Sequence, residues 1–312
     1  MRRWVVLAVS ICVVPSMLAT AACSRAAPSP PTEQGTSSLV EGRADIGGYS
    51  LAFECEGTGS PTVVLEAGYT ASGIDTYGRT ILPGLAKTTR VCTYDRAGDG
   101  ASDPRPISVR PLTGATQAAE LHALLRAIHV PGPYVLVGHS YGGMVVREFA
   151  ARYGPEVGGM VLIDASSEPE IPVYRRLRAG AWIDGTVLPA PNQKIDIGAT
   201  VRQLERAPSL GALALVVITA GILEDRWLRT DPGLEARAQT RLANLSSNSI
   251  HVLAANTGHF IPENDPGLVS AVVLAVVEAA RSGGPLAPCA KVVRSSASAE
   301  CVAPGQLVHQ RI

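Results

Sequence analysis

The chain has 312 residues, of which 46% are hydrophobic, and Lys plus Arg balance Asp plus Glu at 27 each. This length and apolar content suffice for one large domain with a hydrophobic core, and they exclude a chain disordered beyond its two ends. The balanced charge, without a long run of Lys or Arg, argues against nucleic acid as a partner.

The first residues have the pattern of an export signal. Two arginines precede an apolar run over 4–18, which is short for a permanent transmembrane helix, and small residues follow over 19–22. Cleavage fits either after Ala-Thr-Ala at 19–21 or just before Cys23, whose setting LATAAC resembles the lipobox of bacterial lipoproteins. We therefore expect a signal peptide over 1–22 and an exported protein. It is either secreted or anchored to the outer face of the cell membrane through a lipid on Cys23.

Residues 23–38 are rich in Pro, Ser, Thr and Gly, which predicts a flexible tether before a folded domain over 39–312. Within that domain, β-rich runs alternate with helical patterns, and several runs are continuously apolar, as parallel strands covered on both faces are. The predicted strands are 49–55, 62–65, 90–94, 134–137, 160–163, 213–218 and 249–254. The clearest predicted helices are 116–128, 144–153 and 268–280. The Gly- and Pro-containing segment 282–312 is expected to be a surface-bound tail.

The sharpest local signal is a strand that runs through Gly-x-Ser-x-Gly directly into a helix. Val-Leu-Val at 135–137 is followed by Gly138-His-Ser140-Tyr-Gly142 and then by an apolar helical pattern. A nucleophilic serine must sit on a tight turn with its hydroxyl projected, and Gly138 and Gly142 remove side chains that would crowd it. A Gly-rich structural turn is the alternative, but the strand and helix on either side favour Ser140 as a nucleophile.

Three more motifs accompany this turn: Val-Leu-Glu-Ala-Gly-Tyr over 64–69, Tyr-Asp-Arg-Ala-Gly-Asp-Gly-Ala-Ser-Asp over 94–103, and Gly-His-Phe over 258–260. On these residues the chain resembles the α/β-hydrolase superfamily over about 47–281, in particular its bacterial esterase-like and peptidase-like members. The resemblance implies the α/β-hydrolase fold, a mostly parallel eight-stranded sheet with helices on both faces. It also implies a small cap insertion, here 165–211, over the pocket. In such members the segment 95–98 is a structural loop.

The resemblance also implies the groups that would assist Ser140. His259 has the position from which similar members present the catalytic imidazole, so it is the expected general base. The N–H of Tyr141 is one expected donor to the developing oxyanion, and the resemblance adds the N–H of Tyr69. Tyr69 as a plain loop aromatic is the alternative. The other histidines, which are expected to be structural or solvated, are His122, His129, His139, His251 and His309.

Two carboxylates compete for the role of the acid that orients His259. Most superfamily members place it in a Gly-x-x-Asp turn after the seventh strand, but here the turn is one residue longer and puts Glu224 at the usual offset, before Asp225. Asp164 instead ends the sixth strand, where some relatives carry their acid. A carboxylate at the tip of a buried strand needs a partner. We choose Asp164, with Asp225 as the rival.

The expected activity is that of a serine hydrolase, most simply a carboxylic ester hydrolase acting through an acyl-enzyme on Ser140, with an ester or amide as substrate. An aminopeptidase-like or carbon–carbon bond hydrolase, or a non-catalytic binding protein of the same fold, stays open. A haloalkane dehalogenase is disfavoured because such enzymes carry Asp at the position of Ser140. The sequence contains neither metal-ligand spacing nor a nucleotide-binding glycine motif, so we expect no cofactor and no metal.

Four cysteines remain in the mature domain. In the family topology the second strand, which holds Cys55, lies antiparallel to the fourth, which holds Cys92, and facing residues there suit a disulfide. Cys289 and Cys301 would then staple the tail. Export implies an oxidising setting, although buried free thiols are the alternative for the first pair.

Overall fold

The computed structural model describes residues 39–106, 112–170, 188–190, 193–224, 232–308 and 310–311. The predicted signal peptide over 1–22 and the tether over 23–38 lie outside these residues, as does much of the predicted cap. Within the described ranges, none of the helices combines the length and the apolar character that a membrane span requires.

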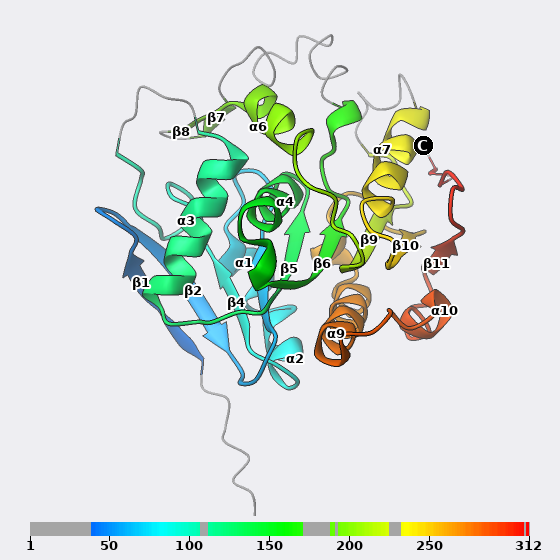
Figure 1. Ribbon diagram of the computed structural model, residues 1–312, viewed down its shortest axis with the longest axis horizontal. Coiled ribbons are helices and arrows are strands. Elements are labelled where there is room, and N and C mark those ends of the chain that lie inside the picture. The colour runs from blue at the N-terminus through cyan, green and yellow to red at the C-terminus, as the bar shows by residue number, and fades with distance from the viewer. Residues whose placement is uncertain are drawn as a thin grey trace, which may run out of the picture. The chain divides into compact units, whose positions relative to one another are not determined.

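Nine of the described strands form one sheet, in the order β1-β2-β4-β3-β5-β6-β9-β10-β11 (Figure 1). Neighbouring strands from β4 to β10 run parallel, whereas β1, β2 and β11 pair antiparallel at the two edges. The strands are β1 (Val40–Asp45), β2 (Ser50–Glu56), β3 (Thr62–Glu66), β4 (Val91–Tyr94), β5 (Tyr134–His139), β6 (Val157–Ile163), β9 (Ala214–Ala220), β10 (Ser249–Ala254) and β11 (Ala299–Val302). A separate hairpin pairs β7 (Leu188–Ala190) with β8 (Gln193–Ile195).

The ninth strand corrects the expected count of eight. β11 comes from the predicted surface tail and pairs with the outer edge of β10, where Cys301 lies opposite Val252. Its four residues, Ala-Glu-Cys-Val, are exposed or half-buried and show no apolar run. The strand exists because the edge of β10 offers unpaired backbone groups, which no local sequence pattern reveals.

Side chains of the central strands alternate between two hydrophobic cores, one on each face. In β6, Met160 and Leu162 join one core, whereas Val161 and Ile163 join the other. Helices α3, α4, α6 and α7 contribute to the first core, and α1, α2, α8, α9 and α10 to the second. In Figure 1, α3 and α4 lie apart from α9. This alternation confirms the expected α/β sheet with helices on both faces.

The helices largely match the predicted periodic segments. Their bounds are α1 (Gly73–Tyr77), α2 (Leu82–Ala86), α3 (Gly114–Ala127), α4 (Gly142–Tyr153), α6 (Ile197–Leu204), α7 (Pro232–Ala243), α8 (Ile261–Asn264), α9 (Pro266–Ser282) and α10 (Cys289–Val292). The longest, α9, begins after Asp265, whose carboxylate accepts the N–H of Leu268, and it ends at Gly283 in the left-handed conformation. Such caps satisfy backbone groups that a helix leaves unpaired at its ends.

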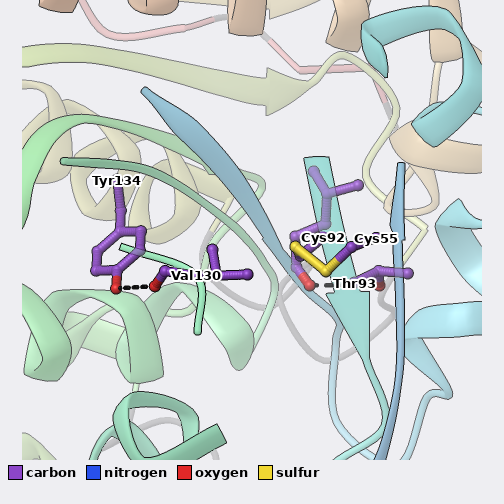
Figure 2. The surroundings of a disulfide bond; sticks show 6 residues. Cys55, Cys92, Thr93, Val130 and Tyr134 are labelled. Atoms are coloured by element: carbon purple, nitrogen blue, oxygen red, sulfur yellow. Dashed lines mark hydrogen bonds between the residues drawn. A yellow bond between two sulfur atoms is a disulfide. The ribbon is translucent and has the colours of Figure 1, made fainter. Parts of the chain in front are cut away.

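Both expected disulfides are present. Cys55 and Cys92 are directly opposed on β2 and β4, with Cα atoms 4.1 Å apart, and Figure 2 shows the bond between these strands. Cys289 of α10 joins Cys301 of β11, with Cα atoms 6.0 Å apart. Two disulfides are typical of a protein that folds in an oxidising compartment.

We expect mass spectrometry under non-reducing conditions to find both disulfides and no free thiol at these four positions. The double substitution of Cys289 and Cys301 by alanine should lower the free energy of unfolding by roughly 3 kcal/mol, because the bond closes a loop of sequence separation 12. Urea unfolding without reductant measures the free energy of unfolding of the double variant and of the wild-type protein. The wild-type protein unfolded in the presence of reductant is the reference. Four free thiols in the native protein would contradict the pairing.

Candidate active site

The predicted nucleophile lies on a sharp turn between β5 and α4. Ser140 has φ = 52°, a left-handed backbone conformation that is uncommon outside glycine. Its N–H donates to the carbonyl of Ile163 at 3.0 Å, and its own carbonyl accepts the N–H of Gly143 and of Ser166, each at 3.0 Å. These bonds hold the strained turn that an exposed catalytic hydroxyl requires.

The two motif glycines serve helix packing, which corrects the expectation that they clear space for the hydroxyl itself. A Cβ added at Gly138 would lie 2.7 Å from the carbonyl oxygen of Gly142, at the start of α4. A Cβ added at Gly142 would lie 2.5 Å from the carbonyl oxygen of Ala67, in the loop after β3. Glycine at both positions therefore lets α4 approach the sheet closely enough to present Ser140 at its end.

Three predicted side chains meet at the carboxyl ends of β5, β6 and β10. His259 Nε2 lies 3.0 Å from Ser140 Oγ, and His259 Nδ1 lies 2.7 Å from Asp164 Oδ2. The carboxyl ends of parallel strands lie at the same edge of a sheet. Asp164 and Ser140 therefore contact His259 although they precede it by 95 and 119 positions in the chain. The imidazole thus bridges a hydroxyl and a carboxylate.

Asp164 is anchored independently of the histidine. Asp164 has φ = 40° and is 9% exposed. Its Oδ1 accepts the N–H of Ala220 at 2.9 Å. Its own N–H donates to the carbonyl of Ile218 at 2.7 Å. The carboxylate is therefore held by β9 on one side while its second oxygen faces His259. The rival acid, Asp225, lies outside the described residues.

The loop after β3 lies against the nucleophile. A Cβ added at Gly68 would be 3.5 Å from the Cβ of Ser140, so the backbone of Gly68 and Tyr69 passes close to the hydroxyl. The Tyr69 ring packs edge-on against that of Tyr141, with centroids 6.2 Å apart, and the Tyr141 hydroxyl donates to Gln117 at 2.5 Å. Both residues whose amides are the candidate oxyanion donors are thus fixed beside Ser140.

A buried ion pair holds this loop from behind. Arg96, 4% exposed, contacts the carboxylate of Glu66, which is fully buried, at 2.5 Å. The same guanidinium donates to the carbonyl of Ala67 at 2.8 Å and to that of Gly68. In a trans peptide the N–H points opposite the preceding C=O, so the bond to Gly68 sets the direction of the Tyr69 N–H. Glu66 is the counterion that makes this arrangement possible.

The motif over 95–98 acts as the structural loop that the resemblance implied. The Asp95 carboxylate accepts hydrogen bonds from Ser72 Oγ at 2.7 Å and from the N–H of Ala101 at 2.8 Å. Neither contact involves Ser140 or His259. Asp95 therefore organises the loops next to the site, while Arg96 supports the candidate oxyanion donor.

Sequence reasoning missed two residues that contact the backbone of His259. His139 was grouped with the structural histidines, but its Nε2 lies 2.9 Å from the His259 carbonyl oxygen and the two rings are 4.8 Å apart. Glu224 was considered only as an acid for the imidazole, whereas its carboxylate accepts the His259 N–H at 3.1 Å. The unusual length of the turn at Glu224 was the only sequence signal for this contact.

The other candidate histidines lie elsewhere. His122 contacts Glu156 at 3.1 Å and stacks on Tyr153. His251 lies inside β10, where its Nε2 is 2.7 Å from Thr219 Oγ1.

 His251 is thus a buried strand residue, and burial lowers its pKa to about 4. His309 lies outside the described residues. His259 is therefore the imidazole that the described part of the structure brings to Ser140.

A family model described as "alpha/beta hydrolase fold" matches residues 61–196, which include the Ser140 turn and Asp164. Among solved structures, a thermophilic esterase from Thermogutta terrifontis aligns with 78% of this chain and 98% of its own, at 21% identity and a TM-score of 0.54. The chain therefore has the α/β-hydrolase fold.

Two curated relatives align with much of this chain. The uncharacterized protein YqjL of Bacillus subtilis is 27% identical over 69% of this chain and 82% of its own. A 2-hydroxy-6-oxononadienedioate/2-hydroxy-6-oxononatrienedioate hydrolase of Paraburkholderia xenovorans is 27% identical over 73% of each chain. Three further relatives share 30 to 44% identity only locally, and the alignments span 16 to 33% of their length.

Proposed function

We propose that this α/β-hydrolase is a serine hydrolase that cleaves carboxylic esters through an acyl-enzyme on Ser140. The observation that carries the proposal is the continuous line of contacts from Ser140 Oγ to His259 Nε2 at 3.0 Å and from His259 Nδ1 to Asp164 at 2.7 Å. A nucleophile, a base and an orienting acid in this geometry define nucleophilic catalysis on a carbonyl.

The reaction would proceed in two halves. Ser140 Oγ attacks the ester carbonyl while His259 Nε2 takes the hydroxyl proton, and Asp164 stabilises the resulting imidazolium through Nδ1–H. The backbone N–H groups of Tyr69 and Tyr141 would receive the oxyanion. His259 then protonates the leaving alcohol, which leaves an acyl group on Ser140. Water, deprotonated by His259, releases the carboxylic acid, so the cycle consumes water and no cofactor or metal.

The surface beside the base favours an apolar substituent on the substrate. Phe260 follows His259 directly, is 56% exposed, and its ring centroid lies 5.5 Å from that of the imidazole. An exposed aromatic ring at this position offers apolar contact to an acyl or alcohol chain. The substrate proposed here is therefore a small ester with an apolar group. The class named for the Paraburkholderia relative, a 2-hydroxy-6-oxo dienedioate, is the second candidate because that relative aligns over 73% of this chain.

We further propose that the enzyme acts outside the cytoplasm. Its two disulfides support an oxidising compartment, and the N-terminal pattern is that of an export signal. Either free secretion or a lipid on Cys23 agrees with this pattern. With or without a lipid anchor at Cys23, the proposed substrate is a small molecule, and no nucleic acid partner is proposed.

The test is covalent labelling with a fluorophosphonate probe, together with rates on short and long acyl esters, Pro-peptides and a 2-hydroxy-6-oxo dienedioate. We expect the probe to modify Ser140, located by peptide mass spectrometry, and esters to be hydrolysed faster than peptides. Heat-denatured protein is the control, since only an activated serine reacts. Absence of labelling would favour a binding protein, and faster peptide cleavage would favour an aminopeptidase.

A further inference from the structure

The backbone of His259 is held on both sides by side chains that are not part of the Ser140–His259–Asp164 line. The carboxylate of Glu224 accepts the N–H of His259 at 3.1 Å. His139 Nε2 lies 2.9 Å from the carbonyl oxygen of the same residue, which also accepts the N–H of Ile261 at 3.0 Å. The two peptide groups that flank the His259 Cα therefore have fixed directions.

We propose that Glu224 and His139 are positioning residues that clamp the His259 backbone and thereby aim its imidazole at Ser140. The inference rests on the proposed function, because it assigns these residues to the reaction of that site. The orientation of an imidazole is set by its backbone and by two side-chain torsions, so a displaced peptide moves Nε2 away from the hydroxyl.

Glu224 has the features of such a clamp rather than of a core residue. Its side chain is exposed, and Asp164 already occupies the Nδ1 side of the imidazole. The carboxylate instead lies directly over Gly258, where an added Cβ would come within 2.1 to 2.4 Å of its atoms. Glycine at position 258 therefore keeps open the space in which the Glu224 carboxylate reaches the next N–H.

A second contact ties the Glu224 loop to the His259 loop. The N–H of Leu223 donates to the carbonyl of Arg311 at 2.7 Å, and the N–H of Arg311 donates to the carbonyl of Gly221 at 2.7 Å. The guanidinium of Arg311 donates to Asn256 Oδ1 at 2.8 Å. One residue of the C-terminal segment thus bridges the loops after β9 and β10, so Glu224 approaches His259 from a supported backbone.

His139 provides the other half of the clamp and connects it to the nucleophile. It directly precedes Ser140, and it is only 4% exposed. Burial, assisted by the neighbouring His259, lowers the pKa of His139 to about 4, so its imidazole is neutral near pH 7. A neutral ring has one N–H, and on Nε2 that group donates to the His259 carbonyl. The serine turn and the base loop are thereby joined.

The first experiment compares Glu224→Ala with Glu224→Gln in the full chain. We expect Glu224→Ala to lower both kcat on a short p-nitrophenyl ester and the fluorophosphonate labelling rate by on the order of 10- to 100-fold, with KM within about twofold. Glu224→Gln should recover most of the loss, because its amide oxygen still accepts the His259 N–H. A purely structural role would lower Tm while leaving kcat per folded molecule unchanged.

The second experiment uses Gly258→Ala as a matched variant. Its added Cβ displaces the Glu224 carboxylate, so alone it should reproduce the loss seen in Glu224→Ala. In the Glu224→Ala background it should add less than about a threefold loss, because the two changes remove one contact. His139→Leu, compared with His139→Gln, tests the carbonyl side in the same way, with Tm recorded for each variant.

Three outcomes would overturn the clamp. The first is labelling of Glu224→Ala at the wild-type rate, and the second is Glu224→Gln as slow as Glu224→Ala. The third is additive losses for Gly258→Ala and Glu224→Ala. Ser140→Ala separates this failure from that of the proposed function, since a probe that still labels Ser140→Ala has reacted elsewhere. If only the clamp proposal fails, the probe still labels the wild-type protein at Ser140 and does not label the Ser140→Ala protein.

Discussion

Replacing Ser140 with alanine is expected to lower ester turnover by on the order of a millionfold, as when the nucleophile of a coupled triad is lost. His259 would then have no hydroxyl to activate, although the candidate oxyanion donors remain. Folding should survive because the bonds that hold the turn use the backbone of residue 140, to Ile163, Gly143 and Ser166, and not its hydroxyl.

The measurement is kcat on the best ester of the panel, with protein purified free of contaminating esterases. Ser247→Ala, which removes an exposed hydroxyl bonded to the carbonyl of Gly211 at 3.1 Å, is the matched control and should retain wild-type activity. If Ser140→Ala keeps activity within tenfold of wild type, another residue is the nucleophile.

Replacing Asp164 with asparagine is expected to lower kcat by on the order of 10⁴-fold. The N–H of Ala220 requires an acceptor at the Oδ1 position, so the asparagine oxygen should take that place and turn its NH₂ group toward His259. A donor facing Nδ1 favours the imidazole tautomer with its proton on Nε2, which cannot accept the proton of Ser140. Folding should be kept, because asparagine tolerates the φ of 40° found at this position.

The matched variant is Asp225→Asn, which we expect to change kcat little. Measuring kcat and Tm for both variants separates a lost acid from a lost fold. The opposite ranking of the two variants would transfer the role of acid to Asp225.

The sequence by itself determined the α/β architecture and the nucleophile turn. Continuous apolar runs such as 160–163 indicated strands covered on both faces, and the two cores of the sheet have this arrangement. Gly-x-Ser-x-Gly between a strand and a helix indicated the turn at Ser140. These signals can be read because they depend on neighbours within a few residues.

Only the tertiary structure decided how distant segments complete the site. The contact of Glu224 with the His259 N–H spans 35 residues, and the contact of Arg96 with the Gly68 carbonyl spans 28. Pairing of β11 with β10 likewise depends on an edge formed by another part of the chain. The two loop contacts depend on where the loops leave neighbouring strands. A change of one or two residues in loop length would move either side chain away from its partner. No local periodicity or turn residue encodes that placement, because it is set by the packing of the whole sheet.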